Sequence, residues 1–206
     1  SMGLAPKADQ RSLEQRFEAA LEQFAQHERF LKRASKREIF QQLHARSRLC
    51  ARLERLLALA PVDTGLLAQD RQTWETLPPL PDTLSAAIQR RFDAALAVLT
   101  EAPEQAPALI AQLEQNLERK QIDCIRMEIV AGIESPPEFA QQRMEYQVAR
   151  LSASLAGSAS KADYLHDPRL LQEEWCLIGA LPADVEAELD TRFLRALDAW
   201  HQQEEA

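Results

Sequence analysis

The chain has 206 residues, of which 46% are apolar, and a formal net charge of −8. This is enough apolar material to bury a core, which excludes a wholly disordered chain. Five glycines, few β-branched residues and abundant Ala, Leu, Gln, Glu and Arg favour helices and leave little material for strands. We therefore expect an all-α protein, built as a coiled-coil-like array of about eight antiparallel helices in tandem repeats.

Apolar residues that recur at steps of three and four predict the helices. We expect them at about residues 8–34, 36–60, 65–76, 82–101, 106–132, 136–156, 168–178 and 184–203. Asp167 followed by Pro168 is typical of a helix start, and Gly179 is typical of the position after a helix end. Ser135 and Glu138 form the S-x-x-E pattern of a capping box, which predicts the start of an added amphipathic helix that ends near residue 157.

Apolar runs are short and interrupted by charges, and the N-terminus lacks the basic-then-apolar plan of a signal peptide. The sequence thus predicts a soluble, cytoplasmic protein that makes no membrane contact. Cys50, Cys124 and Cys176 are far apart and odd in number, so we expect buried, reduced thiols rather than disulfides or a metal-binding pair.

Two segments repeat each other at a shift of 101 residues: WETLPPLP from Trp74 and WCLIGALP from Trp175, each followed by a helix with an Arg-Phe pair. We interpret the two tryptophans as structural, each covering the corner between a short helix and the Arg-Phe helix, with an anchor for a partner peptide as the alternative. If its ring is buried, Trp175→Ala should cost about 3–5 kcal/mol. The matched positions of the motif are Trp74, Pro81, Phe92, Trp175, Gly179, Pro182 and Phe193.

The helix after each Arg-Phe helix repeats as well, since the segment 50–54 (CARLE) corresponds to 124–128 (CIRME). A truncated third copy opens the chain, with Gly3, Pro6 and Phe17 in matching places. We therefore expect the C-terminal part of a longer protein. Its predicted divisions are a truncated repeat at 1–34, a full repeat at 35–132, an inserted amphipathic helix at 133–160, and a C-terminal repeat with its cap at 161–206.

The order Trp, then Ile-Gly-x-Leu-Pro, then Arg-Phe-x-x-Ala-Leu resembles the bacterial helical repeat family catalogued as domain of unknown function 349. In this chain the pattern is carried by Trp175, Ile178-Gly179, Leu181-Pro182, Arg192-Phe193 and Ala196-Leu197. The first copy departs from the pattern, because Pro78 and Pro79 replace the Ile-Gly neighbourhood. The resemblance implies a helical array in a bacterial cytoplasmic protein and carries no activity with it.

Motifs that carry chemistry are missing from the sequence. It contains no phosphate-binding loop, dinucleotide turn or nucleophile elbow. The histidines are scattered and lack the spacing of metal ligands: His27, His44, His166 and His201. We therefore nominate no catalytic, cofactor-binding or metal-binding residue, and we expect that the protein is not an enzyme.

Charge is unevenly distributed along the chain. Residues 1–60 hold 12 Lys and Arg against 7 Asp and Glu, whereas the remainder holds 12 against 25. Basic side chains recur at helical spacing in the first part and would form a ridge suited to nucleic-acid phosphates if they shared one side: Arg29, Lys32, Arg33, Lys36, Arg37, Arg48, Arg52 and Arg55. The alternative interpretation is solvated helix faces with pairs such as Glu28–Lys32.

The sequence favours a non-catalytic scaffold or adaptor that binds another macromolecule, with an unidentified protein as the expected partner. The alternative is an RNA- or DNA-associated protein that contacts phosphates through the basic helices at 29–55. Its binding would be strongly salt-dependent. Oligomeric state stays open, because an apolar helix face at residues 8–34 could pair with a second copy.

Overall fold

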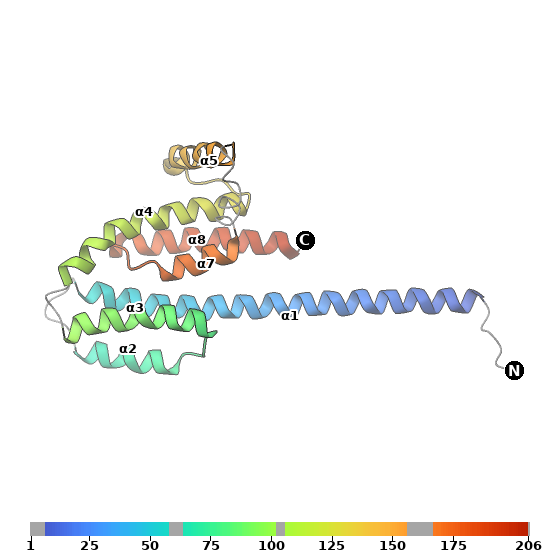
Figure 1. Cartoon of the computed structure of the whole chain (residues 1–206), viewed down its shortest axis with the longest axis horizontal. Coiled ribbons are helices and arrows are strands. Elements are labelled where there is room, and N and C mark those ends of the chain that lie inside the picture. Colours follow the sequence, from blue (N-terminus) through green and yellow to red (C-terminus); the bar gives the residue numbers. More distant parts are fainter. Residues whose placement is uncertain (1–6, 58–63, 102–105, 156–166, 206) are drawn as a thin grey trace. The chain divides into compact units, whose positions relative to one another are not determined.

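A computed structural model describes residues 7–57, 64–101, 106–155 and 167–205, and every regular element in these ranges is helical (Figure 1). No strand occurs in them, which confirms the all-α expectation. The elements are α1 (Lys7–Leu56), α2 (Thr64–Thr76), α3 (Asp82–Thr100), α4 (Ala106–Val130), the 3₁₀ turn η2 (Pro137–Phe139), α5 (Ala140–Leu155), α7 (Pro168–Leu177) and α8 (Ala183–Glu205). None of these helices is apolar over a length that would cross a bilayer.

Helix α1 is continuous, so the predicted break near residue 35 was wrong. The break was placed at a boundary between repeats, where the sequence offers no helix-breaking residue. Neither glycine nor proline occurs between Pro6 and Pro61. Ala, Lys and Arg around Ser35 have high helix propensity, so the backbone hydrogen bonds continue through this point.

The chain divides into two compact units, residues 1–41 and 42–206. In the first unit, α1 exposes a row of large apolar side chains at helical spacing: Leu13, Phe17, Leu21, Phe24 and Leu31. No described contact covers them. The predicted third copy of the Trp–Pro corner, at Gly3 and Pro6, lies outside the described residues.

The core of the second unit lies among α3, α4, α7 and α8, where α4 packs against both α7 and α8 and α3 contacts α7 (Figure 1). Its largest fully buried side chains include Ile88, Ile125, Leu171, Trp175 and Phe193. The three cysteines are free and buried, as expected. Burial raises the pKa of the Cys50 and Cys176 thiols to about 12 and also raises that of Cys124, so these groups stay protonated.

Helix α7 begins as predicted, because the Asp167 carboxylate accepts a hydrogen bond of 2.9 Å from the backbone N–H of Arg169. The predicted capping box at Ser135 was wrong. Pro136 is the N-cap of η2 without a side-chain bond, and the Ser135 hydroxyl donates instead to Glu128 at 2.5 Å. The Ser135 oxygen accepts from the Arg143 guanidinium at 3.1 Å instead of from a helix N–H. The predicted end of this helix near residue 157 lies outside the described residues.

Candidate functional site

The two tryptophans occupy equivalent corners with nearly the same geometry. Trp74 stacks on Phe92 with ring centroids 4.0 Å apart and 19° between the planes. Trp175 stacks on Phe193 at 4.2 Å and 9°. Pro81 and Pro182 follow as the helix starts, and the carbonyl of each accepts the first backbone hydrogen bond of α3 or α8. The motif predicted from sequence therefore forms the same joint twice.

Each indole ring also has two polar neighbours, which occupy equivalent positions in the two copies. The Trp74 N–H donates to Gln89 at 3.0 Å, and that of Trp175 donates to Asp190, at the equivalent position, at 3.3 Å. A cation lies over each ring, with Arg46 5.4 Å from the Trp74 centroid. The Lys120 ammonium lies 4.5 Å from the centroid of Trp175.

A guanidinium–carboxylate pair joins the two long helices of each copy. Arg91 binds Glu54 through two parallel hydrogen bonds of 2.6 and 2.8 Å. Arg192 binds Glu128 with the same two distances. Burial is the largest single influence and opposes both cations, but the hydrogen bond to the partner carboxylate and the nearby negative charges together outweigh it, so the pKa of Arg91 and of Arg192 is raised. The paired hydrogen bonds fix the register of the helices.

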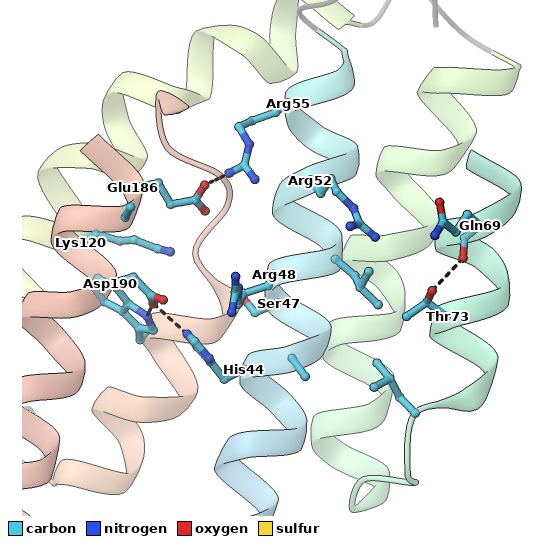
Figure 2. A pocket seen from close by; sticks show the side chains of 15 residues that line it. His44, Ser47, Arg48, Arg52, Arg55, Gln69, Thr73, Lys120, Glu186 and Asp190 are labelled. Carbon is cyan, nitrogen blue, oxygen red and sulfur yellow. Dashed lines mark hydrogen bonds and ion pairs between the residues drawn. The ribbon is translucent and has the colours of Figure 1, made fainter. Parts of the chain in front are cut away.

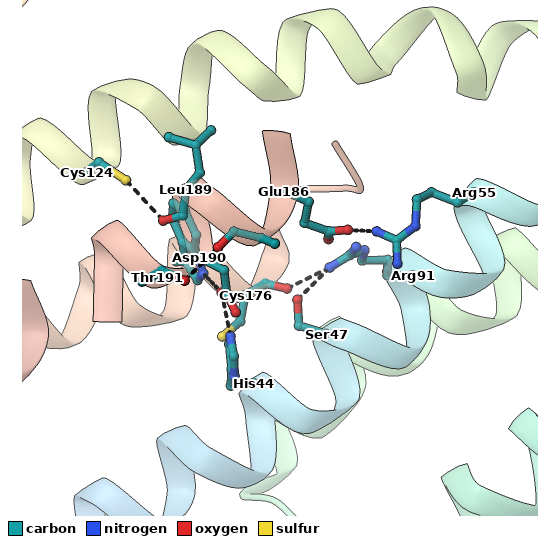
Figure 3. Close-up of polar contacts among 12 residues, drawn as sticks. His44, Ser47, Arg55, Arg91, Cys124, Cys176, Glu186, Leu189, Asp190 and Thr191 are labelled. Atoms are coloured by element: carbon teal, nitrogen blue, oxygen red, sulfur yellow. Dashed lines mark hydrogen bonds and ion pairs between the residues drawn. The ribbon is translucent and has the colours of Figure 1, made fainter. Parts of the chain in front are cut away.

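The Trp175 corner also connects the two copies. Its backbone meets the first ion pair, because Arg91 donates to the Cys176 carbonyl at 2.8 Å (Figure 3), and Glu54 accepts from the Ala180 N–H at 2.5 Å. Glycine is favoured at position 179, since a Cβ there would lie 2.5 Å from the Asn116 amide nitrogen and would displace that side chain. The sequence motif thus builds a junction between successive repeats.

The second ion pair meets the inserted segment instead of another repeat. The Phe139 ring lies 3.9 Å from the Arg192 guanidinium, and Ser135 donates to Glu128. Arg143 of α5 holds this segment by donating to Ser135 at 3.1 Å and to the Ile133 carbonyl at 2.7 Å. The inserted segment therefore covers the Arg192–Glu128 pair, as the Trp175 corner covers the Arg91–Glu54 pair of the first copy.

The predicted basic residues fall into both compact units, and each group is described by itself. In the first unit, Arg29 is exposed and donates to the Ala25 carbonyl at 3.2 Å, and Lys32 pairs with Glu28 at 2.7 Å. The Glu28–Lys32 pair is the arrangement that the solvated-face interpretation expects. The other side chains range from exposed to half-buried: Arg33, Lys36 and Arg37.

In the second unit, two of the three predicted arginines are already engaged by carboxylates of other helices. Arg52 binds Asp70 of α2, with one hydrogen bond of 3.0 Å, and Arg55 pairs with Glu186 of α8. Arg48 is exposed and makes no hydrogen bond or ion pair with the residues that the structure describes. The three side chains line one pocket rather than an open ridge.

This pocket measures about 670 Å³ and lies between α1, α2, α4, α7 and α8 (Figure 2). A His44–Asp190 contact of 2.8 Å forms part of its wall, and the Trp175 ring lines it as well. Its polar lining consists of His44, Ser47, Arg48, Arg52, Arg55, Gln69, Thr73, Lys120, Glu186 and Asp190. The predicted site residues Arg48, Arg52 and Arg55 therefore meet the other polar side chains of α2, α4 and α8 in this pocket.

Burial changes the acid–base behaviour of two groups in the pocket. Lys120 is only 4% exposed, and this burial, assisted by the nearby Arg91 charge, lowers the pKa of its ammonium to about 8. Burial alone would raise the pKa of Asp190, but the hydrogen bond from His44 and the charge of that ring outweigh it and the pKa is lowered. The pocket therefore holds a carboxylate that stays ionised and an ammonium that is costly to keep charged.

Sequence reasoning missed Lys120, Arg46 and the two ion pairs. A signal for them was present in the repeat itself. Arg46 and Lys120 each precede the repeated cysteine by four residues, at the same shift of 74 that relates Glu54 to Glu128. Opposite charges that recur at matched buried positions of two helices indicate a structural ion pair, whereas a basic residue in the same register as a tryptophan indicates a cation over the ring.

Among the described residues, no group of three or more His, Cys, Asp and Glu side chains is placed to hold a metal ion. Comparisons of the chain with protein-family models, with curated proteins and with solved structures gave no match.

Proposed function

We propose that this chain is a non-catalytic helical-repeat scaffold of the bacterial family that it resembles, and that it binds another protein in the cytoplasm. The observation that carries the proposal is the apolar row on α1. Leu13, Phe17, Leu21 and Phe24 are each more than half exposed and recur at steps of three or four residues. A contiguous row of large exposed apolar side chains is typical of a protein-binding surface.

The repeat indicates what kind of contact this row makes. Phe17 stands in the Arg-Phe pair of the truncated copy, in the place of Phe92 and Phe193. Both of those rings are buried beneath a tryptophan of a short helix. Phe17 itself is 65% exposed. A partner helix with an apolar or aromatic face therefore suits the α1 row best.

Helix α5 carries a second row of exposed apolar side chains, Met144, Val148, Leu151 and Leu155. This row supplies a matched control for the first one, since substitutions there change an equally apolar surface on a different helix. The α5 row also allows non-specific hydrophobic binding to be measured separately from binding at the Arg-Phe position of α1.

The experiment is affinity purification from bacterial lysate with three forms of the chain: wild type, Phe17→Asp with Phe24→Asp, and Val148→Asp with Leu151→Asp. Proteins that bind through α1 should disappear from the second form and remain with the third. If the α1 variant retains every captured protein at the wild-type level, the proposal is wrong. A parallel purification with nuclease tests whether nucleic acid bridges the contact.

The alternative, contact with RNA or DNA phosphates through basic helices, is supported by the exposure of Arg29 and Lys36 on α1. Reversing Arg29, Arg33 and Arg37 to glutamate should then weaken nucleic-acid binding at low salt. It should also make the dependence on salt shallower, by about 0.9 in slope for each phosphate that the chain no longer neutralises. Unchanged affinity and slope would dismiss this alternative without affecting the protein-binding proposal.

A further inference from the structure

We propose that the pocket between α1, α4 and α8 binds the phosphate group of a small phosphorylated molecule, held between Lys120 and Arg48. This function does not depend on the scaffold proposal, because it concerns a concave site in the second compact unit and not the exposed apolar row on α1.

Lys120 is the strongest argument. Its side chain is almost fully buried, with only 4% exposed, and it extends from α4 toward the pocket (Figure 2). Within the described residues it makes one polar contact, the cation–π contact with Trp175, and no ion pair or hydrogen bond. Burying an ammonium without a direct ion pair is costly, so an anion bound beside it would stabilise the charge at this position.

Arg48 supplies the second cation from the opposite wall. It lies one helical turn after His44 on α1 and its guanidinium extends into the same pocket (Figure 2). No described residue occupies its donors. A guanidinium matches the geometry of phosphate oxygens, and a lysine adds a point charge, so the two together suit a doubly charged tetrahedral anion.

The other charged side chains of the pocket each have a direct polar partner. Arg55 pairs with Glu186, and Arg52 pairs with Asp70. Asp190 accepts hydrogen bonds from His44 and from the Trp175 indole. The four cations Arg48, Arg52, Arg55 and Lys120 thus face three carboxylates, Asp70, Glu186 and Asp190, so the pocket keeps an excess of positive charge.

Size and lining favour a phosphorylated molecule over a bare ion. A volume of about 670 Å³ lies in the range of about 300–1,000 Å³ that small-molecule sites occupy, and it exceeds what one phosphate group needs. Beyond the two cations, the hydroxyls of Ser47 and Thr73 and the amide of Gln69 line the pocket. These groups suit the hydroxyls of a sugar attached to the phosphate.

Calorimetric titration of the whole chain tests the proposal with four probes: orthophosphate, ribose 5-phosphate, AMP and unphosphorylated ribose. At least one of the two phosphorylated molecules should bind at least tenfold more tightly than orthophosphate, and ribose should not bind. Preference for AMP over ribose 5-phosphate, or the reverse, identifies the source of the phosphate group.

Two variants and a matched control place the binding in the pocket. Lys120→Met and Arg48→Met should each weaken binding at least tenfold, whereas Arg119→Met, which removes the neighbouring cation on α4 outside the pocket, should leave it unchanged. Lys120→Met should keep or raise the melting temperature, because it replaces a buried charge with an apolar chain of similar length. A purely structural lysine would instead lower the melting temperature without changing phosphate affinity.

The proposal is overturned if none of the phosphorylated probes binds at millimolar concentration, or if they bind equally well to Lys120→Met, Arg48→Met and Arg119→Met. Should Lys120→Met fail to fold, Arg48→Met decides alone, because this side chain is exposed and contributes little to the core. Binding that responds only to long RNA or DNA, with no effect of either pocket variant, would likewise overturn it.

Discussion

The two Trp–Phe corners make the same contacts but differ in burial. Trp74 and Trp175 stack on equivalent phenylalanines and donate to equivalent side chains, yet Trp74 is only half-buried whereas Trp175 is 1% exposed. The difference arises because the Trp175 corner also packs on the first ion pair through Cys176 and Ala180. Local sequence thus determines the contacts within a repeat, and the neighbouring repeat determines how much those contacts contribute to stability.

The largest difference between the copies should appear in their ion pairs. Glu128→Ala leaves Arg192 buried without its carboxylate, and breaking a buried pair in this way costs about 3–5 kcal/mol of unfolding free energy. Glu54→Ala should cost less, because Arg91 keeps hydrogen bonds to Ser47 and to the Cys176 carbonyl (Figure 3). Chemical denaturation of the two variants measures the difference.

A double variant provides the control for this comparison. Replacing both members, Glu128→Leu with Arg192→Met, removes the stranded charge and should recover most of the loss, since apolar residues of similar volume often replace a buried pair without cost. Equal losses for the Glu54→Ala and Glu128→Ala variants would show that the neighbouring repeat does not support Arg91.

The next largest loss of stability should come from truncating the two tryptophan rings. Trp175→Ala should cost about 3–5 kcal/mol, as for large core truncations, and Trp74→Ala roughly half as much, because the half-buried ring removes less apolar area from water. Thermal or denaturant unfolding measures both. A Trp74→Ala loss equal to that of Trp175→Ala would mean that stacking on the phenylalanine, which both corners share, outweighs the burial that only one of them has.

The sequence predicted the parts of this fold that depend on local pattern. Helix positions followed from the spacing of apolar residues, and the Trp–Phe corners followed from a repeat in which buried positions match. The break in α1 was misplaced because it came from the repeat boundary rather than from a breaker in the sequence. Ser135 was misassigned because a capping box is a local signal, whereas its hydroxyl donates to Glu128 of α4 and accepts from Arg143 of α5.

The candidate site was harder to predict because its partners come from distant segments. Arg52 and Arg55 were expected on an open ridge, but Asp70 and Glu186 reach them from α2 and α8. Lys120 lies in a charged stretch of α4 that looks solvent-exposed in sequence. Only the packing of α4 against α7 and α8 buries its ammonium beside Trp175. Periodicity identifies faces of helices, whereas tertiary packing decides which charges meet.

A smaller effect distinguishes Gly179 from Gly132 in the second copy. Gly179→Ala places a methyl group 2.5 Å from the Asn116 amide, which must move and release its hydrogen bond to the Ala180 carbonyl. We expect a loss of about 1–3 kcal/mol. Gly132→Ala should cost about 1–2 kcal/mol for a different reason, since its φ of +62° disfavours a side chain although space is available.

Adding Asn116→Ala separates these two causes. The shorter side chain removes the obstacle at Gly179, so the double variant Gly179→Ala with Asn116→Ala should lose less stability than the sum of the single changes. Combined with Gly132→Ala, the Asn116→Ala change should instead lower stability by its full separate amount. The strain at position 132 lies in the backbone, and Asn116 does not affect it. If the losses of Gly179→Ala and Asn116→Ala simply add, the contact between the new methyl group and the Asn116 amide is not the cause of the Gly179→Ala loss.

The last comparison concerns a carboxylate that only the second copy has. Asp123 stands where the first copy has Leu49, and burial, assisted by the charge of Glu174, raises its pKa to about 7 although Arg126 lies 2.7 Å away. Between about pH 4 and 7 the folded chain therefore holds a proton that the unfolded chain has lost, so stability should fall as pH rises through this window. Asp123→Asn, which cannot titrate, should flatten that fall. Denaturation midpoints of the wild type and of the variant at pH 4.5 and 7.5 test this prediction. Parallel pH dependences of the two proteins would mean that the Arg126 charge keeps Asp123 ionised throughout.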